Sequence, residues 1–117
     1  MNPSSANAAV SIEQFQVELR RIARFIPAIA MPDPLTAIVD TIVEHPAYTE
    51  SRLLARLLAA LTYQRGEFRL AEGAVFSSST LALIIGLLDG LGRGNISEAQ
   101  CRRAVEMADA AQRTVAS

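Results

Sequence analysis

Apolar residues recur along most of the chain with the spacing of an α-helix. Between residues 11 and 26 they follow one another at steps of three or four, which is typical of a narrow seam that packs on another helix. The seam residues are Ile12, Phe15, Leu19, Ile22 and Ile26. Ser11 and Gln14 have capping-box spacing, and Pro27 disfavours helical geometry at the residue before it. We therefore expect a first helix over residues 11–26.

Two further stripes predict two more helices. Asp33 is a candidate cap with Pro34 in the first turn, and apolar residues then follow at i, i+3, i+4, i+7 and i+8 between Leu35 and Val43. The third helix is expected from Thr49 to about Gln64. Leucines repeat along it, and the alanines between them would let a neighbouring helix approach closely.

Residues 67–76 fit two structures. Glu67 to Leu70 alternates between polar and apolar residues like a short strand, whereas Phe68, Ala71 and Val75 share one helical face. We favour a helix, because a two-stranded hairpin alone would be marginal. Gly73 would weaken that helix.

The C-terminal third predicts two more helices. Residues 81–91 are apolar on nearly every side, as in a helix that is sandwiched in the fold or awaits a partner. Ser97 and Gln100 repeat the capping-box spacing before a last helix with a small-residue inner face. We expect one all-α domain over residues 11–117, behind a disordered leader at residues 1–10 that has little to bury.

A short pattern occurs twice, at residues 65–71 and 93–99. Each copy has Arg-Gly, one polar residue, a large apolar residue, two spacers and an alanine. Gly66 and Gly94 can adopt the left-handed conformation that reverses a chain after a helix. The repeat predicts five to six helices in stacked antiparallel hairpins, as in tetratricopeptide-like proteins, with the first helix as an extra element.

Composition and charge limit the classes of function that fit this chain. A formal charge of −1 is unlike that of a nucleic-acid binder. All 11 basic residues are arginines, which either a GC-rich genome or selection against lysine would produce. The lone Cys101 can form no internal disulfide, and no apolar run approaches the ~20 residues of a membrane span. Without a signal-peptide pattern, a cytoplasmic protein is expected.

Candidate chemistry is sparse. His45 is the only histidine and has no ligand or catalytic partner at a useful spacing. Gly90, Gly92 and Gly94 follow a helix instead of a strand, which favours helix capping over a phosphate loop. We therefore expect no catalytic residues, no cofactor and no metal, and a protein that is not an enzyme.

Residues 58–72 resemble a tetratricopeptide turn. Together with the Leu-rich segment 81–92, which ends in Leu-Gly and is followed by Arg-Gly, they are similar to the small needle-subunit chaperones of bacterial type III secretion systems. The resemblance covers about residues 38–105. The first helix is extra, Arg103 stands where the second hairpin should present a large apolar residue, and the helix at residues 81–91 lacks an expected aromatic residue.

The resemblance implies a chaperone that holds the amphipathic C-terminal helix of a needle subunit, with a small helical co-chaperone completing the complex. In that family the binding face is formed by the first helices of the hairpins. The corresponding partner-binding residues here are Leu53, Arg56, Ala60, Tyr63, Leu81, Ile84, Leu88 and Leu91.

Two other functions stay open from the residues alone. The chain could be a structural or adaptor homo-oligomer, in which Leu19 and Ile22 of the first seam pair with a second copy. It could also be a DNA-binding regulator that contacts phosphates through Arg20-Arg21 or Arg102-Arg103.

Overall fold

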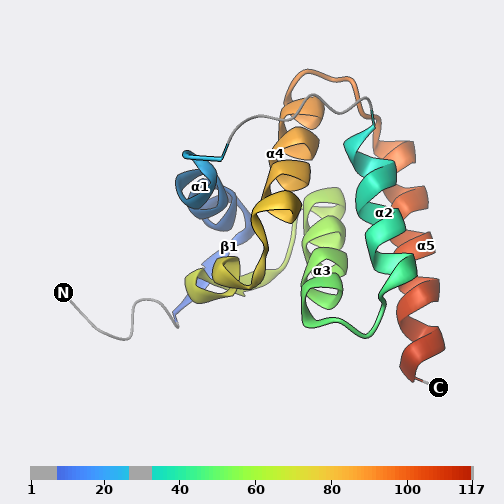
Figure 1. Cartoon of the computed structure of the whole chain (residues 1–117). Helices are drawn as coiled ribbons and strands as arrows, with labels where there is room; N and C mark the ends of the chain where they lie inside the picture. The colour runs from blue at the N-terminus through green and yellow to red at the C-terminus, as the bar shows by residue number, and fades with distance from the viewer. Residues whose placement is uncertain (1–7, 27–32, 117) are drawn as a thin grey trace.

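The computed structural model describes residues 8–26 and 33–116 (Figure 1). In chain order the elements are β1 (Ala9–Ser11), α1 (Ile12–Ala23), α2 (Pro34–Glu44), α3 (Thr49–Tyr63), β2 (Glu67–Arg69), the 3-10 helix η2 (Leu70–Val75), α4 (Ser78–Gly92) and α5 (Glu98–Ala116). The predicted all-α class is confirmed, since the described residues form six helices and only two strands of three residues each.

Local hydrogen bonds start the helices where the sequence predicts. Ser11 Oγ accepts from the Gln14 backbone N–H at 3.2 Å, and Gln14 Oε1 accepts from the Ser11 N–H at 3.0 Å. Asp33 caps α2 by accepting from the Thr36 N–H at 3.0 Å. The box of Ser97 and Gln100 is also formed. The end of α1 differs, because it comes at Ala23 instead of residue 26. Pro27 and the expected connector at residues 31–32 lie outside the described residues.

Helices α2, α3 and α5 form one packed unit, visible at the centre and right of Figure 1. A short connection at residues 45–48 turns α3 back along α2. Helix α5 lies against both and runs parallel to α2, since Gln112 near its end donates to the Pro46 carbonyl at 2.8 Å. Its buried side chains are small, so the three helices approach closely: Cys101, Ala104 and Ala108.

Helix α4 lies between α1 and α2, which explains its apolar surface (Figure 1). Its buried residues are Thr80, Leu81, Ile84, Leu87 and Leu88. Of the two sequence-based interpretations of this helix, the sandwiched one is correct. Glu50 of α3 holds its start, accepting from the Ser77 N–H at 2.8 Å and from the Thr80 hydroxyl.

A two-stranded sheet corrects two expectations. β1 and β2 are antiparallel, with Val10 opposite Phe68, so the helix favoured for residues 67–76 is wrong: a strand comes first and a 3-10 helix comes after it. The strand is viable because its partner comes from residues 9–11 and because Phe68 stacks on Phe15 of α1, with ring centroids 4.5 Å apart. Ala9 and Val10 are thus strand residues instead of disordered leader, while residues 1–7 lie outside the described part.

The two copies of the Arg-Gly pattern both have a glycine with positive φ, at 134° for Gly66 and 76° for Gly94. The left-handed residue that ends α3 is Gln64 (φ 56°, ψ 39°) and not the expected Gly66. The two turns also lead into different elements. The first turn leads into β2, whereas the second leads into α5, which packs on α2 and α3. Helix α4 packs mainly on α1 and α2 instead of along α5. The helices are therefore not paired as the repeat alone suggests.

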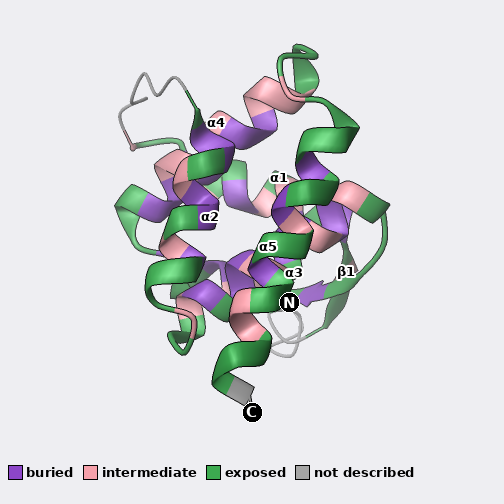
Figure 2. Cartoon of the chain, turned by 90° about the vertical axis from the view of Figure 1, so that its right-hand side faces the viewer, coloured by how far each residue is buried: buried purple, intermediate pink, exposed green. Residues whose placement is uncertain are grey.

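Buried positions line the inner sides of the helices, as Figure 2 shows. The α1 seam contributes Ile12, Phe15 and Leu19, all at 2% exposure or less, so it packs within its own chain. Among the described residues, no helix is long and apolar enough to cross a membrane.

Candidate functional site

The structure does not gather the eight predicted partner-binding residues on one open face. Five of them are in the core: Leu53, Ala60, Leu81, Ile84 and Leu88. Leu91 is half-buried, whereas Arg56 and Tyr63 are exposed. The α4 residues belong to the helix that packs on α1 and α2. Three residues of α3, Arg56, Ala60 and Tyr63, border one common cavity.

That cavity is a surface groove of about 400 Å³ between α3, β2 and α5, called the α3–α5 groove below. Its lining is Arg56, Ala59, Ala60, Tyr63, Arg65, Gly66, Glu67, Phe68, Val105 and Asp109. Small and apolar side chains form the floor, and charges of both signs stand around it. The groove therefore presents an apolar centre with a polar rim.

Small residues create this hollow. Ala59 and Ala60 leave space on α3, and a Cβ placed on Gly66 would lie 3.2 Å from the Ala60 Cβ, so the turn rests directly on the helix. Tyr63 forms a wall with 45% of its surface exposed, and the Arg65 guanidinium stands over its ring at 5.8 Å. An exposed aromatic side chain next to an apolar floor is a typical feature of protein-binding surfaces.

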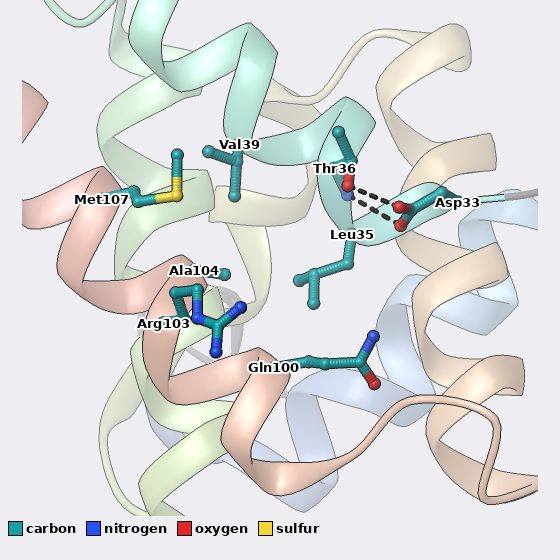
Figure 3. Close-up of a pocket in the computed structure, with 8 residues that line it drawn as sticks. All are labelled: Asp33, Leu35, Thr36, Val39, Gln100, Arg103, Ala104 and Met107. Atoms are coloured by element: carbon teal, nitrogen blue, oxygen red, sulfur yellow. Dashed lines mark hydrogen bonds between the residues drawn. The ribbon is translucent and has the colours of Figure 1, made fainter.

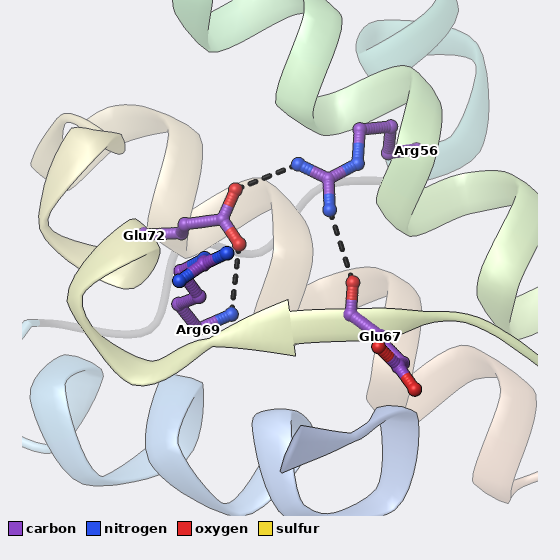
Figure 4. Close-up of polar contacts among 4 residues, drawn as sticks. All are labelled: Arg56, Glu67, Arg69 and Glu72. Atoms are coloured by element: carbon purple, nitrogen blue, oxygen red, sulfur yellow. Dashed lines mark hydrogen bonds and ion pairs between the residues drawn. The ribbon is translucent and has the colours of Figure 1, made fainter. Parts of the chain in front are cut away.

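Arg56 joins α3 to the β2 side of the groove, as Figure 4 shows. Its guanidinium donates to Glu72 Oε2 at 2.6 Å and to the Glu67 carbonyl at 3.0 Å. It also lies 5.0 Å from the centre of the Phe68 ring. Glu72 in turn accepts from the Arg69 backbone N–H at 2.8 Å. Arg56 thus ties β2 and η2 to α3 and holds the groove's edge in place.

Glu72 remains ionised in this arrangement. Burial by itself would raise the pKa of Glu72, but the Arg69 N–H and the Arg56 guanidinium outweigh it and hold that pKa below its ordinary value. Both hydrogen bonds to this carboxylate are therefore charge-assisted at neutral pH.

A second, smaller cavity of about 170 Å³ lies between α2 and α5 (Figure 3), and is called the α2–α5 pocket below. Leu35, Val39, Ala104 and Met107 provide its apolar surface. Its polar lining is Asp33, Thr36, Gln100 and Arg103. Arg103, the residue that departs from the resemblance, is thus exposed at a cavity mouth instead of packing in a hairpin.

The surroundings of Cys101 and His45 indicate structural roles. Cys101 is buried, and burial raises the pKa of its thiol, so the thiol is protonated at neutral pH. His45 ends α2 and stacks on Tyr48, with ring centroids 4.5 Å apart. Within the described ranges, no group of three or more His, Cys, Asp or Glu side chains is placed to hold a metal ion.

Sequence reasoning missed most of the groove's lining. Val105 and Asp109 come from α5, and Phe68 from a strand whose partner lies far away in the sequence. The one available signal was the Arg-Gly pattern, which marks Phe68 as the large apolar residue after the turn.

Comparisons with models of known protein families, with curated proteins and with solved structures give no match to this chain.

Proposed function

We propose that this protein is a non-enzymatic interaction protein, a chaperone or adaptor whose α3–α5 groove binds an amphipathic helix of a small partner protein. The observation that carries the proposal is the position of Arg56, Ala60 and Tyr63. They border a single groove with an apolar floor. In the version that the family resemblance implies, the chain is a bacterial cytoplasmic chaperone and the partner is a type III secretion needle subunit.

The groove suits such a partner physically. An amphipathic helix places its apolar side chains in a groove at i, i+3 or i+4 and i+7 and keeps its polar face outside. Ala59 and Val105 offer accessible apolar surface above the buried Ala60 and Phe68. Arg65, Glu67 and Asp109 on the rim could pair with charges of either sign. A hollow of about 400 Å³ accommodates more than one side chain, so it fits a helix better than a single anchoring residue.

The first test uses the purified chain without a partner. We expect it to self-associate and to bind a hydrophobic dye, because the groove then remains uncovered. Tyr63→Asp and Ala59→Glu introduce charge into the groove and should lower dye fluorescence and self-association. Tyr48→Asp is the matched control, since Tyr48 is 60% exposed and does not line the groove.

The same variants should fail to co-purify with a co-expressed helical partner, while the Tyr48 variant keeps it. A wild-type chain that is monomeric by light scattering and binds no dye would count against the proposal.

The two alternative functions gain no specific support from the contacts. Of the two α1 seam residues needed for pairing with a second copy, Leu19 is buried and Ile22 is half-buried in their own chain. Of the four basic residues of the DNA-binding alternative, three form ion pairs: Arg20 with Asp89 at 3.1 Å, Arg21 with Glu18 at 2.7 Å and Arg102 with Glu98 at 2.5 Å. Salt-sensitive DNA binding would revive the second alternative.

A further inference from the structure

The α2–α5 pocket opens onto a longer seam between two parallel helices. Leu35 and Val39 line the pocket from α2, and Val43 lies one turn beyond Val39 on the same helix face. Val43 is 49% exposed and Met107 of α5 is 50% exposed. The seam thus offers the hollow drawn in Figure 3 and, beyond it, the exposed apolar side chain of Val43.

The two charged residues of the pocket differ in their partners. The Asp33 carboxylate accepts from the Thr36 N–H at 3.0 Å and from the Thr36 hydroxyl at 2.5 Å, and these bonds hold the pKa of Asp33 below its ordinary value. Arg103 lines the same pocket, and no carboxylate of the described residues forms an ion pair with it. The neighbouring Arg102 differs, since it pairs with Glu98. Across the described part of the chain, the pocket therefore combines an unpaired cation with an anion already in use.

We propose that this seam is a second docking surface, one that takes a short amphipathic helix of a partner protein with a carboxylate beside its first apolar anchor. One apolar side chain of the partner enters the pocket, and another, four residues along, covers Met107 and Val43. A carboxylate of the partner pairs with Arg103. The charge of Arg103 selects a carboxylate at that one position, because the exposed Asp40, Glu44 and Glu106 lie next to Val39, Val43 and Met107 along the rest of the seam. The spacing along α2 and α5 selects a helix.

The pocket size fits one such anchor. Its volume of about 170 Å³ is close to that of the ~150 Å³ protein cavity known to accept benzene. A leucine or phenylalanine side chain is of this size. The two cavities have no lining residue in common, so the two surfaces can be occupied and tested separately.

The test uses the full chain and an amidated, alanine-rich helical peptide. The peptide carries two leucines at i and i+4 and a glutamate one turn before the first; a second version has glutamine in place of the glutamate. We expect the acidic peptide to bind and to shift the NMR signals of the Met107 methyl and the Arg103 side chain. The glutamine version should bind about threefold to tenfold more weakly, as for one charge-assisted contact.

Variants then assign the contact. Arg103→Gln should lower the affinity for the acidic peptide by the same factor and leave the affinity for the glutamine peptide unchanged. A double-mutant cycle measures this coupling. Arg102→Gln is the control, because that arginine already pairs with Glu98, and it should change neither affinity. Met107→Asp should lower the affinity for both peptides by about tenfold or more.

Three outcomes would overturn the proposal. They are equal affinity for the two peptides, signal shifts confined to the α3–α5 groove, and self-association of the chain that Met107→Asp abolishes. The last would assign the seam to a second copy. The proposed function is tested separately, through the Tyr63 and Ala59 variants of the α3–α5 groove.

Discussion

At the scale of single residues, Arg56 carries the most connections around the candidate groove. It contacts the side chain of Glu72, the backbone of Glu67 and the ring of Phe68, so one side chain joins α3 to two later elements. Its side chain and that of Glu72 are 52% and 25% exposed, so solvent weakens the ion pair. The main contribution of Arg56 is therefore to hold β2 in position against α3.

Arg56→Ala is expected to lower the free energy of unfolding by about 1 kcal/mol, because charge-assisted contacts are lost at a partly exposed site. It should also speed amide exchange of Arg69, whose N–H is held by Glu72. Arg102→Ala removes an exposed pair within one helix and should cost only about 0.3 kcal/mol. Urea unfolding and hydrogen exchange measure both effects. Equal losses in the two variants would show that Arg56 does not fix β2.

Among the helices, α4 contains two glycines that differ in the space around them, Gly90 and Gly92. A Cβ on Gly90 would lie 2.7 Å from Ile96 Cδ1 and 3.1 Å from its Cγ1. A Cβ on Gly92, at the end of the same helix, would meet nothing within 4 Å. The Gly90 site thus lets the connection to α5 fold tightly onto α4, whereas the Gly92 site has no such contact.

Gly92→Ala should therefore raise the free energy of unfolding by about 0.5 kcal/mol, through helix propensity and a less flexible unfolded chain. Gly90→Ala should give no gain or a loss of about 1 kcal/mol, because Ile96 must move. Adding Ile96→Val, which removes Cδ1, should recover part of that loss. Thermal unfolding followed by circular dichroism measures the three variants. A stabilising effect of Gly90→Ala alone would contradict the tight contact.

At the scale of the whole molecule, α1 is part of the core instead of an appended helix. Phe15 stacks on Phe68, Leu19 is fully buried, and Arg20 pairs with Asp89 of α4. The first seam therefore joins the N-terminal strand and helix to elements from the middle of the chain.

Leu19→Ala should lower the free energy of unfolding by about 3 kcal/mol, as for other buried leucines, without changing the mass of the particle. Val17→Ala on the same helix, at a position 69% exposed, should change it by less than about 0.5 kcal/mol. Denaturant unfolding and light scattering measure the two quantities. A smaller particle with unchanged stability would mean that the seam pairs with a second copy.

Features that depend on neighbours three or four residues apart can be predicted from the amino-acid sequence. The capping pairs at Ser11, Asp33 and Ser97, the ion pairs of Arg102 and Arg113, and the buried stripes of the helices are all contacts within one or two turns. Such contacts follow from helical geometry alone. The all-α class follows from them as well.

Which helix packs against which apolar face depends on the tertiary structure. Helical spacing shows that Leu81, Ile84 and Leu88 share a face, but α1 and α2, instead of a partner, cover the helix that carries them. The strand at Glu67–Arg69 needed Ala9–Ser11 from the far N-terminal end, and the groove beside it needed Val105 from α5. These pairings join residues far apart in the chain, and their energies depend on packing that no local pattern encodes.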